Sequence, residues 1–583
     1  MKWLSLLTVL ISFSAAAQNI GIGTARPQSK LHIAGDLRID SLAVSKAKGL
    51  VFHSESGVLK SIKFTGNRND VLRGDGTFSA AEVAGTSWLT TGNAGTDPAV
   101  NFVGTTDAQP LRFRVLNTWM GTLTLSHDLV AFGFNTLQAN TSGSNNIALG
   151  AWALEKNTGG SHNISIGVQS LNRNTTGIAN IAIGSTALFA NTTGEGNIAL
   201  GGTSLALNNT GQNNIAIGSG SLGANTSGSR NLAIGTFALS SNKSGTELTA
   251  VGTEALNLNT SGARNTAFGY RALMLTTSGS DNTSAGFQAL MNNKTGSRNT
   301  AFGYEALHWN TLGASNVAVG SKTLWSNRTG YSSVAIGDSA LFSNVGGTNN
   351  TAVGELSMQN LTGGNFNVAY GSWTLNNASV VSNNTAVGHK ALSTLSFGSN
   401  NTALGFGADV TAGNLTNATA IGYNAKVNAS NKERIGNASV TKIEGQVAFT
   451  TPSDGRYKFN VREDVAGLRF IMLLRPVTYQ FDVKRFDGVN DDVTFASYDK
   501  AQSIRRTGFI AQEVEKAADA SGYVFDGVNK PDAADEYYTL SYESFVVPLV
   551  KAMQEQQQII NKQQAEIDEL KAMVKELLKK SAE

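Results

Sequence analysis

The chain contains no cysteine, and its 583 residues include only seven prolines. The absence of cysteine excludes disulfide bonds, zinc–thiolate sites and thiol nucleophiles. Charged residues make up 15% of the sequence, against about 25% in ordinary globular domains. Lys and Arg number 45 and Asp and Glu 42, which gives a formal net charge of +3. Because nucleic-acid-binding domains carry a clear excess of basic residues, this balance excludes nucleic acid as an expected partner.

Long apolar runs are absent except at the start of the chain. Lys2 precedes an apolar run over residues 3–13, and three alanines follow, the last at Ala17. A basic start, a short apolar run and small residues are typical of a secretory signal peptide, so we expect cleavage after Ala17. No later run reaches the ~18 apolar residues of a membrane span. The sequence therefore predicts an exported protein, secreted or held at the cell surface, without a transmembrane span.

Glycine recurs at a fixed spacing through the middle of the chain. Gly133, Gly150 and Gly167 begin a series of 18 glycines that ends at Gly422 and has one member in each 17-residue unit. Ala, or Ser in two units, stands two residues before each of them. Leu, or Met in one unit, stands four residues after the first 16, and Asn stands seven residues after most of the first 13. Such a strict short repeat indicates a solenoid, in which each unit packs on its neighbours.

The composition of the repeat favours strands over helices. Each unit has a short strand sequence, such as residues 181–184, and a turn rich in Asn, Thr and Gly, such as residues 191–194. We therefore expect a mainly β fold with a β-solenoid rod over 131–425, and 17 intervals at about 4.8 Å predict a length of ~80 Å. Leu is expected to fill the interior and Asn to form a hydrogen-bonded ladder between coils. The small mid-strand Ala predicts close approach of another backbone, for which a partner chain is the obvious candidate.

The repeat sequence, as in residues 150–154 and 163–167, resembles the heads of trimeric autotransporter adhesins. The resemblance implies a β-roll built from three chains, hence a homotrimer. It also implies a host surface or a glycan as the ligand of the rod, which the sequence does not identify. The 17-residue unit is longer than the usual adhesin repeat.

After residue 452 the sequence becomes rich in charged and aromatic residues. We predict a helix over 467–474, a strand around 477–481, a helix around 511–518 and a long helix from about Tyr542. In that last helix two heptad positions are mainly apolar, which predicts a coiled coil; the alternative is a helix packed on its own domain. The apolar heptad residues are Val546, Met553, Ile560, Ile567 and Val574 at one position and Leu549, Leu570 and Leu577 at the other.

The segment Ser453-Asp454-Gly455-Arg456-Tyr457-Lys458 opens this region. All six histidines precede it, so a nucleophile here is Ser or Thr and a strong base is Lys or a carboxylate. Ser and Lys form a known catalytic pair. In a regular helix or strand, side chains five residues apart point in different directions, so Ser453 and Lys458 meet only through a turn, which Gly455 permits. Lys458 must also be desolvated to act as a base, because the ordinary pKa of Lys is near 10.4.

Four further segments follow in order, at 473–479, 507–514, 538–542 and 548–552. Together with the opening segment, they resemble the intramolecular chaperone domain of endosialidases and phage tail fibres, a self-cleaving peptidase family. The resemblance implies that the domain trimerises, helps a β-fibre to fold and then cuts the chain between Pro452 and Ser453. By position, Ser453 matches the nucleophile and Lys458 the general base, while Asp454 and Arg456 match the accompanying motif residues.

The predicted organisation has six parts. They are a signal peptide (1–17), an N-terminal β-rich fibre segment (18–130), the β-roll (131–425), a connector (426–452), the chaperone and autopeptidase domain (453–545) and the coiled coil (546–583). The first functional hypothesis is an exported, adhesin-like trimeric fibre whose C-terminal domain cleaves itself off. In the second, the domain is a trimerisation module without proteolysis, Ser453 caps a turn and Lys458 is a solvated surface charge.

A third hypothesis is a carbohydrate-active β-solenoid enzyme. Its candidate carboxylates are Asp338 and Glu355, which occupy the same repeat position one coil apart. No cofactor and no metal ion are expected under any of the three hypotheses.

Overall fold

The computed structural model describes residues 94–97, 99, 101–488, 496–531 and 536–582, together with the backbone of six short strands between residues 20 and 80. The chain divides into two compact units, residues 1–106 and 107–583. The expected signal peptide lies outside the described residues. In the first unit the strands form three pairs: β1 (Ile20–Ile22) with β2 (Leu31–Ile33), β3 (Gly49–His53) with β4 (Leu59–Lys63), and β5 (Asp70–Leu72) with β6 (Phe78–Ala80).

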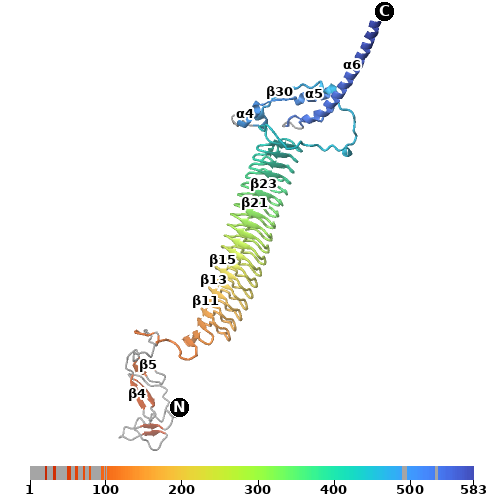
Figure 1. Cartoon of the computed structure of the whole chain (residues 1–583). Coiled ribbons are helices and arrows are strands. Elements are labelled where there is room, and N and C mark those ends of the chain that lie inside the picture. Colours follow the sequence, from red (N-terminus) through yellow and green to blue (C-terminus); the bar gives the residue numbers. More distant parts are fainter. Residues whose placement is uncertain are drawn as a thin grey trace. The chain divides into compact units, whose positions relative to one another are not determined.

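One continuous sheet runs through most of the second unit (Figure 1). It begins with three antiparallel strands, β7 (Leu111–Val115), β8 (Thr118–Thr124) and β9 (Leu129–Phe132). From β9 onward each coil adds one parallel strand in register with the one before, as Ile181 pairs with Ile198.

The coil strands are short and evenly spaced. They are β10 (Ile147–Leu149), β11 (Ile164–Ile166), β12 (Ile181–Ile183), β13 (Ile198–Leu200), β14 (Ile215–Ile217), β15 (Leu232–Ile234), β16 (Thr249–Val251), β17 (Thr266–Phe268), β18 (Thr283–Ala285), β19 (Thr300–Phe302), β20 (Val317–Val319), β21 (Val334–Ile336), β22 (Thr351–Val353), β23 (Val368–Tyr370), β24 (Thr385–Val387), β25 (Thr402–Leu404), β27 (Thr419–Ile421) and β29 (Glu433–Ile435). Thr419 pairs with Glu433, so the last coil is shorter than the coils before it. A side pair joins β26 (Asp409–Val410) to β28 (Lys426–Val427). The predicted β-solenoid is confirmed.

The interior of the rod is filled by one chain. Leu188 has 0% of its surface exposed, as do the leucines at the same place in the neighbouring coils, so the expected Leu column is confirmed. Ala182, in the middle of β12, is also fully buried in this core. The prediction that the mid-strand Ala approaches a partner chain is therefore wrong. The side chain at this position is small because it points into the chain's own narrow coil.

The repeated glycine is required by its backbone and by the stacking of the coils. Gly184 has a φ of +139°, a region that side-chain-bearing residues rarely adopt. A Cβ atom placed on it would lie 2.5 Å from the carbonyl oxygen of Gly201 in the next coil. The coil also turns at Thr186 and Leu188, both left-handed with φ of 55° and 51°. These turns bring the chain back to the same point in each coil.

The expected Asn ladder is confirmed, and a second one lies beside it. In the first, Asn191 Nδ2 donates to Asn174 Oδ1 at 2.8 Å and to the Gly194 carbonyl at 3.0 Å. In the second, the backbone N of Asn197 and its Nδ2 donate to Asn180 Oδ1 at 3.0 and 3.1 Å. Buried polar groups must be hydrogen-bonded, and both ladders meet this demand by repeating one contact over runs of successive coils.

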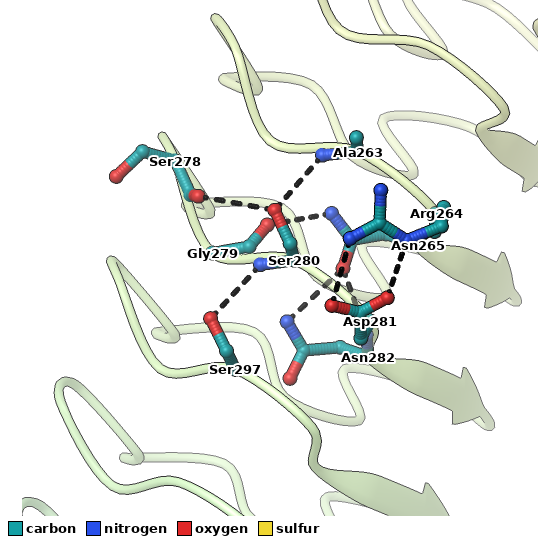
Figure 2. A network of polar contacts seen from close by, with 9 residues as sticks. All are labelled: Ala263, Arg264, Asn265, Ser278, Gly279, Ser280, Asp281, Asn282 and Ser297. Carbon is teal, nitrogen blue, oxygen red and sulfur yellow. Dashed lines mark hydrogen bonds and ion pairs between the residues drawn. The ribbon is translucent and has the colours of Figure 1, made fainter.

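The second ladder is interrupted at Leu248 and resumes at Asn265 and Asn282, where Figure 2 shows it beside the surface pair Arg264 and Asp281. Arg264 Nε lies 2.6 Å from Asp281 Oδ1. This ion pair again links the same position of two successive coils, so the polar surface follows the same register as the core.

The C-terminal region is mixed α and β around a small aromatic core. Buried side chains of Phe470, Phe525 and Phe545 pack with Val514 of a helix. The elements are the 3₁₀ helix η1 (Gly455–Tyr457), α2 (Leu468–Ile471), β30 (Val477–Gln480), α3 (Val483–Asp487), α4 (Ala496–Ser503), β31 (Arg505–Gly508), α5 (Ala511–Ser521), β32 (Val528–Asn529), β33 (Thr539–Leu540), η2 (Tyr542–Phe545) and α6 (Val546–Lys580). β30 pairs antiparallel with β31, and β32 with β33.

The predicted elements are present with different bounds. The helix expected over 467–474 is the single turn α2, and the helix expected over 511–518 is α5. Helix α3, which the sequence analysis does not predict, is capped by Asp482 and ends at left-handed Gly488. The long helix α6 leaves its apolar heptad side exposed, as at Met553. Among the described residues, no helix combines the length and apolarity that crossing a bilayer requires.

Candidate active site

The candidate cleavage site lies in an exposed stretch of chain. Every residue from 440 to 464 is exposed, including Pro452 and Ser453. This stretch separates the last coil of the rod from the aromatic core of the C-terminal region. Both residues of the candidate scissile bond, Pro452 and Ser453, are therefore exposed in a single chain.

The turn that brings Ser453 and Lys458 together is present. Asp454 caps η1 by accepting a hydrogen bond from the backbone N of Arg456 at 2.9 Å. The backbone N of Lys458 donates to the Gly455 carbonyl at 3.1 Å, which closes the turn. As a result Lys458 Nζ lies 2.7 Å from Ser453 Oγ and donates a hydrogen bond to it. The structure thus places the two predicted catalytic side chains in contact.

Asp454 and Arg456 hold the turn through a second, local interaction. Arg456 Nε and Nη2 donate to Asp454 Oδ2 at 2.9 and 2.6 Å. The side-chain hydrogen bond from Arg456 lowers the pKa of Asp454, and the same bond raises the pKa of Arg456. The carboxylate of Asp454 is thus paired with the guanidinium of Arg456, while Lys458 donates its hydrogen bond to Ser453. The four motif residues therefore form two adjacent pairs.

Desolvation of the lysine is not provided by the single chain. Ser453 and Lys458 are both exposed, so their contact at 2.7 Å is open to water. Apolar side chains flank the pair at alternate positions and are themselves exposed, with Phe449 at 92% and Phe459 at 91%. We call these exposed apolar side chains, which precede and follow the Ser–Lys contact in the sequence, the apolar strip. It consists of Val447, Phe449, Tyr457, Phe459 and Val461.

The carboxylates of the third hypothesis do not form an enclosed site. Asp338 and Glu355 are exposed, and Asp338 accepts a hydrogen bond from its neighbour Ser339 at 3.2 Å. A hollow of about 460 Å³ lies elsewhere, lined by residues of 480–503 that include Lys484 and Asp499. In the described part of the chain, no group of three His, Asp or Glu is placed to hold a metal ion.

Comparison with known families gives one match. Residues 453–523 match the family model described as chaperone of endosialidase. The match begins at Ser453 itself. A comparison of the whole chain with curated proteins finds no match. The chain thus carries, C-terminal to a β-solenoid rod, a segment similar to the chaperone of endosialidase.

Two features of the site are missing from the sequence analysis. The first is the apolar strip around Ser453, although the alternation of apolar residues over 447–461 is visible in the sequence. The second is the contact between helix α3 and the last coil of the rod. No local pattern indicates that contact, because its partners Arg434 and Asp487 are far apart in the chain.

Proposed function

We propose that this protein is an exported, adhesin-like fibre whose C-terminal domain promotes trimer assembly and then cuts the chain between Pro452 and Ser453. The observation that carries the proposal is the contact between Ser453 Oγ and Lys458 Nζ at 2.7 Å. It lies at the first residue of the match to the chaperone of endosialidase. In this proposal the rod is the mature product, residues 18–452, and its role is to bind a host surface or a glycan.

The proposed reaction is an acyl transfer followed by hydrolysis. Ser453 Oγ attacks the carbonyl carbon of Pro452, and the neutral amine of Lys458 takes the hydroxyl proton. The peptide C–N bond breaks, the amino group of Ser453 leaves with a proton, and Pro452 becomes an ester on Oγ. Water then hydrolyses the ester, which yields a carboxylate on Pro452 and restores the hydroxyl of Ser453. Because the nucleophile belongs to the residue beside the bond, no substrate has to be bound.

Assembly of three copies supplies the desolvation that this mechanism needs. The apolar strip of residues 447–461 and the apolar side of α6, with Met553 and Leu577, are exposed in one chain. Their burial between copies would remove water from Lys458. Burial disfavours the ammonium form and so lowers the pKa of a lysine. Cleavage is therefore expected only after the domain has assembled.

The rod itself offers a face for the same assembly. Outward-pointing apolar residues follow one another along the sheet, one per coil, with Ile183 at 40% exposure and Phe302 at 44%. A continuous apolar column of this length exceeds the scattered apolar surface of an ordinary monomer. We propose that two further copies of the rod cover it. The column includes Ile183, Ile217, Phe268, Phe302, Val319, Ile336, Tyr370 and Leu404.

Mass spectrometry of four expressed chains tests the cleavage. The wild type is expected to yield fragments that end at Pro452 and begin at Ser453, and Ser453→Ala and Lys458→Ala are expected to remain full length. Lys442→Ala, which removes an exposed lysine in the same connector, is the matched control and should be cut like the wild type. A wild type that stays intact under conditions in which it is trimeric favours the non-cleaving trimerisation module. Equal cutting of the Ala variants would refute the Ser–Lys assignment.

A further inference from the structure

A buried carboxylate joins the C-terminal region to the rod. Asp487, the last residue of α3, accepts hydrogen bonds from Arg434 Nη2 at 2.9 Å and from the backbone N of Ala438 at 2.7 Å. The hydroxyl of Tyr498, on α4, also donates to it at 3.0 Å. The side chain of Asp487 is only 4% exposed and that of Arg434 16%. One carboxylate therefore satisfies donors from both parts of the protein.

Arg434 belongs firmly to the rod. It lies in β29, the last strand of the sheet, and its Nε donates to the Gly436 carbonyl at 3.0 Å. Its Nη1 donates to the carbonyl of Lys426, in β28, at 3.1 Å. The remaining donor, Nη2, is the one that reaches Asp487. The guanidinium is thus fixed by the final coil and presents one free edge to the C-terminal region.

Apolar and aromatic contacts surround this ion pair. Val483, Tyr498 and Ala501 form a buried cluster of α3 and α4, against which Ala438 of the chain leaving the rod packs. The Arg434 guanidinium lies 5.3 Å from the ring centre of Phe486. Lys432 Nζ, one residue before β29, lies 4.7 Å from the ring centre of Tyr537. The contact thus combines a small apolar core with two cation–π pairs.

The two sides of this contact lie on either side of the candidate cut. Arg434 and Ala438 precede the bond between Pro452 and Ser453, while Asp487 and Tyr498 follow it. Separation of the parts would expose the cluster and leave the Asp487 charge without Arg434. A buried ion pair that loses one partner is strongly destabilised. The contact therefore holds the two parts together whether or not the connector is intact.

We propose that helices α3 and α4 form a docking cap that seats the C-terminal domain on the last coil of the rod independently of the peptide link. Cutting the connector then leaves the two fragments bound, and release of the domain is a separate step. This proposal does not rest on self-cleavage, because it concerns a contact and not the cut.

An engineered cut tests the docking cap. In full-length Ser453→Ala, the recognition sequence of a site-specific protease replaces residues 446–451 in the exposed connector. After digestion, the rod and the C-terminal fragment are expected to co-elute on size exclusion in native buffer. With Arg434→Ala or Asp487→Ala added, the apparent Kd between the fragments is expected to rise about a hundredfold or more. Asp499→Asn is the matched control, since it removes an ion pair with Lys484 on the same cap and its side chain is 56% exposed.

Two results would overturn the docking cap. One is separation of the fragments in the parent protein immediately after the cut. The other is binding by Arg434→Ala that equals binding by Asp499→Asn. The Arg434→Ala and Asp487→Ala substitutions lie in different fragments, so Arg434→Ala tests the contact even if Asp487→Ala disturbs the cap. Circular dichroism of each fragment reports whether it is folded. Self-cleavage is measured separately in the wild type, so the outcome of one test leaves the other unchanged.

Discussion

Thr276 interrupts the first Asn ladder directly after Asn259. Asn259 Nδ2 donates to Asn242 Oδ1 at 2.8 Å, as in the other coils. Its own Oδ1 is buried and accepts no hydrogen bond from any described residue, because the shorter Thr276 occupies the next coil. Thr276 is itself fully buried, and Asn293 Nδ2 reaches its hydroxyl only at 3.5 Å. The first ladder thus has a local defect at Thr276.

Thr276→Asn is expected to repair this defect. The new amide would donate to Asn259 Oδ1 and accept from Asn293 Nδ2, as Asn191 does in its coil. A hydrogen bond that satisfies a buried group contributes about 1 kcal/mol, so the free energy of unfolding should rise by about that amount. Urea denaturation of the rod measures it. Ser278→Asn, on the exposed turn two residues later, is the control and should leave the midpoint unchanged; an equal or lower midpoint for Thr276→Asn would contradict the ladder as a source of stability.

Gly184→Ala is expected to destabilise the rod by about 1–3 kcal/mol or more. The residue has a left-handed φ of +139°, and a Cβ atom would lie 2.5 Å from the carbonyl oxygen of Gly201, which is backbone and cannot rotate away. Gly202→Ala is the matched control, because a Cβ atom there meets nothing within 4 Å. Thermal unfolding followed by circular dichroism should show a lower midpoint for the first variant only. Equal midpoints would mean that the repeated glycine is not required for stacking.

The sequence predicts the rod well because most coils obey the same local rule. Three residues recur at fixed spacing: a glycine, a Leu four residues later and an Asn seven residues later. The glycine marks the close approach of successive coils, the Leu marks the interior, and the Asn marks the turn and its ladder. The sequence does not predict whether the side chain of the small mid-strand residue points into its own coil or toward another chain. A narrow single-chain coil and a contact between chains both require Ala182 to be small, and the strand pattern alone does not distinguish them.

The candidate site is predicted in part for the same reason. The contact between Ser453 and Lys458 arises within six residues, so motif spacing and Gly455 suffice to predict the turn. The ion pair of Arg434 and Asp487 depends on tertiary structure. Folding brings Nη2 of Arg434 to 2.9 Å from Oδ1 of Asp487, although the two residues are 53 positions apart in the sequence. No local pattern contains that information. Helix α3 is missed because it is a single short turn, although its Asp482 cap and Gly488 stop are visible in the sequence.

Alkaline pH should weaken the docking cap through Tyr498. Burial, followed by the hydrogen bond to Asp487, raises the pKa of Tyr498 to about 12, from about 10 in an unfolded chain. A pKa that is higher in the folded state means that the neutral phenol is favoured there. Its contribution is fully present below about pH 10 and is lost as the pH rises through about 12. In the engineered-cut protein, co-elution of the fragments should therefore decline over this range.

Tyr498→Phe provides the control for that pH dependence. The phenylalanine keeps the buried ring but has no proton to lose, so its fragments should separate with a shallower dependence on pH between 10 and 12. They should bind somewhat less tightly than the parent at neutral pH, because one donor to Asp487 is gone. If the two proteins follow the same alkaline profile, Tyr498 does not contribute to docking.

Charge placed on the apolar column should prevent rods from associating while leaving each coil intact. Ile183 and Ile217 point outward from β12 and β14 and are partly exposed in one chain. In a single rod, Ile183→Lys with Ile217→Lys keeps both lysines in water, so the coils should remain folded by circular dichroism. Between rods the same lysines would be buried without partners, which is unfavourable. Sedimentation velocity should therefore show trimers for the wild type and smaller species for the double variant. Thr193→Lys with Thr210→Lys, on exposed turns away from the strands of this column, is the matched control. Unchanged trimers in the first double variant would show that this column does not lie between copies, and would leave the C-terminal domain as the source of assembly.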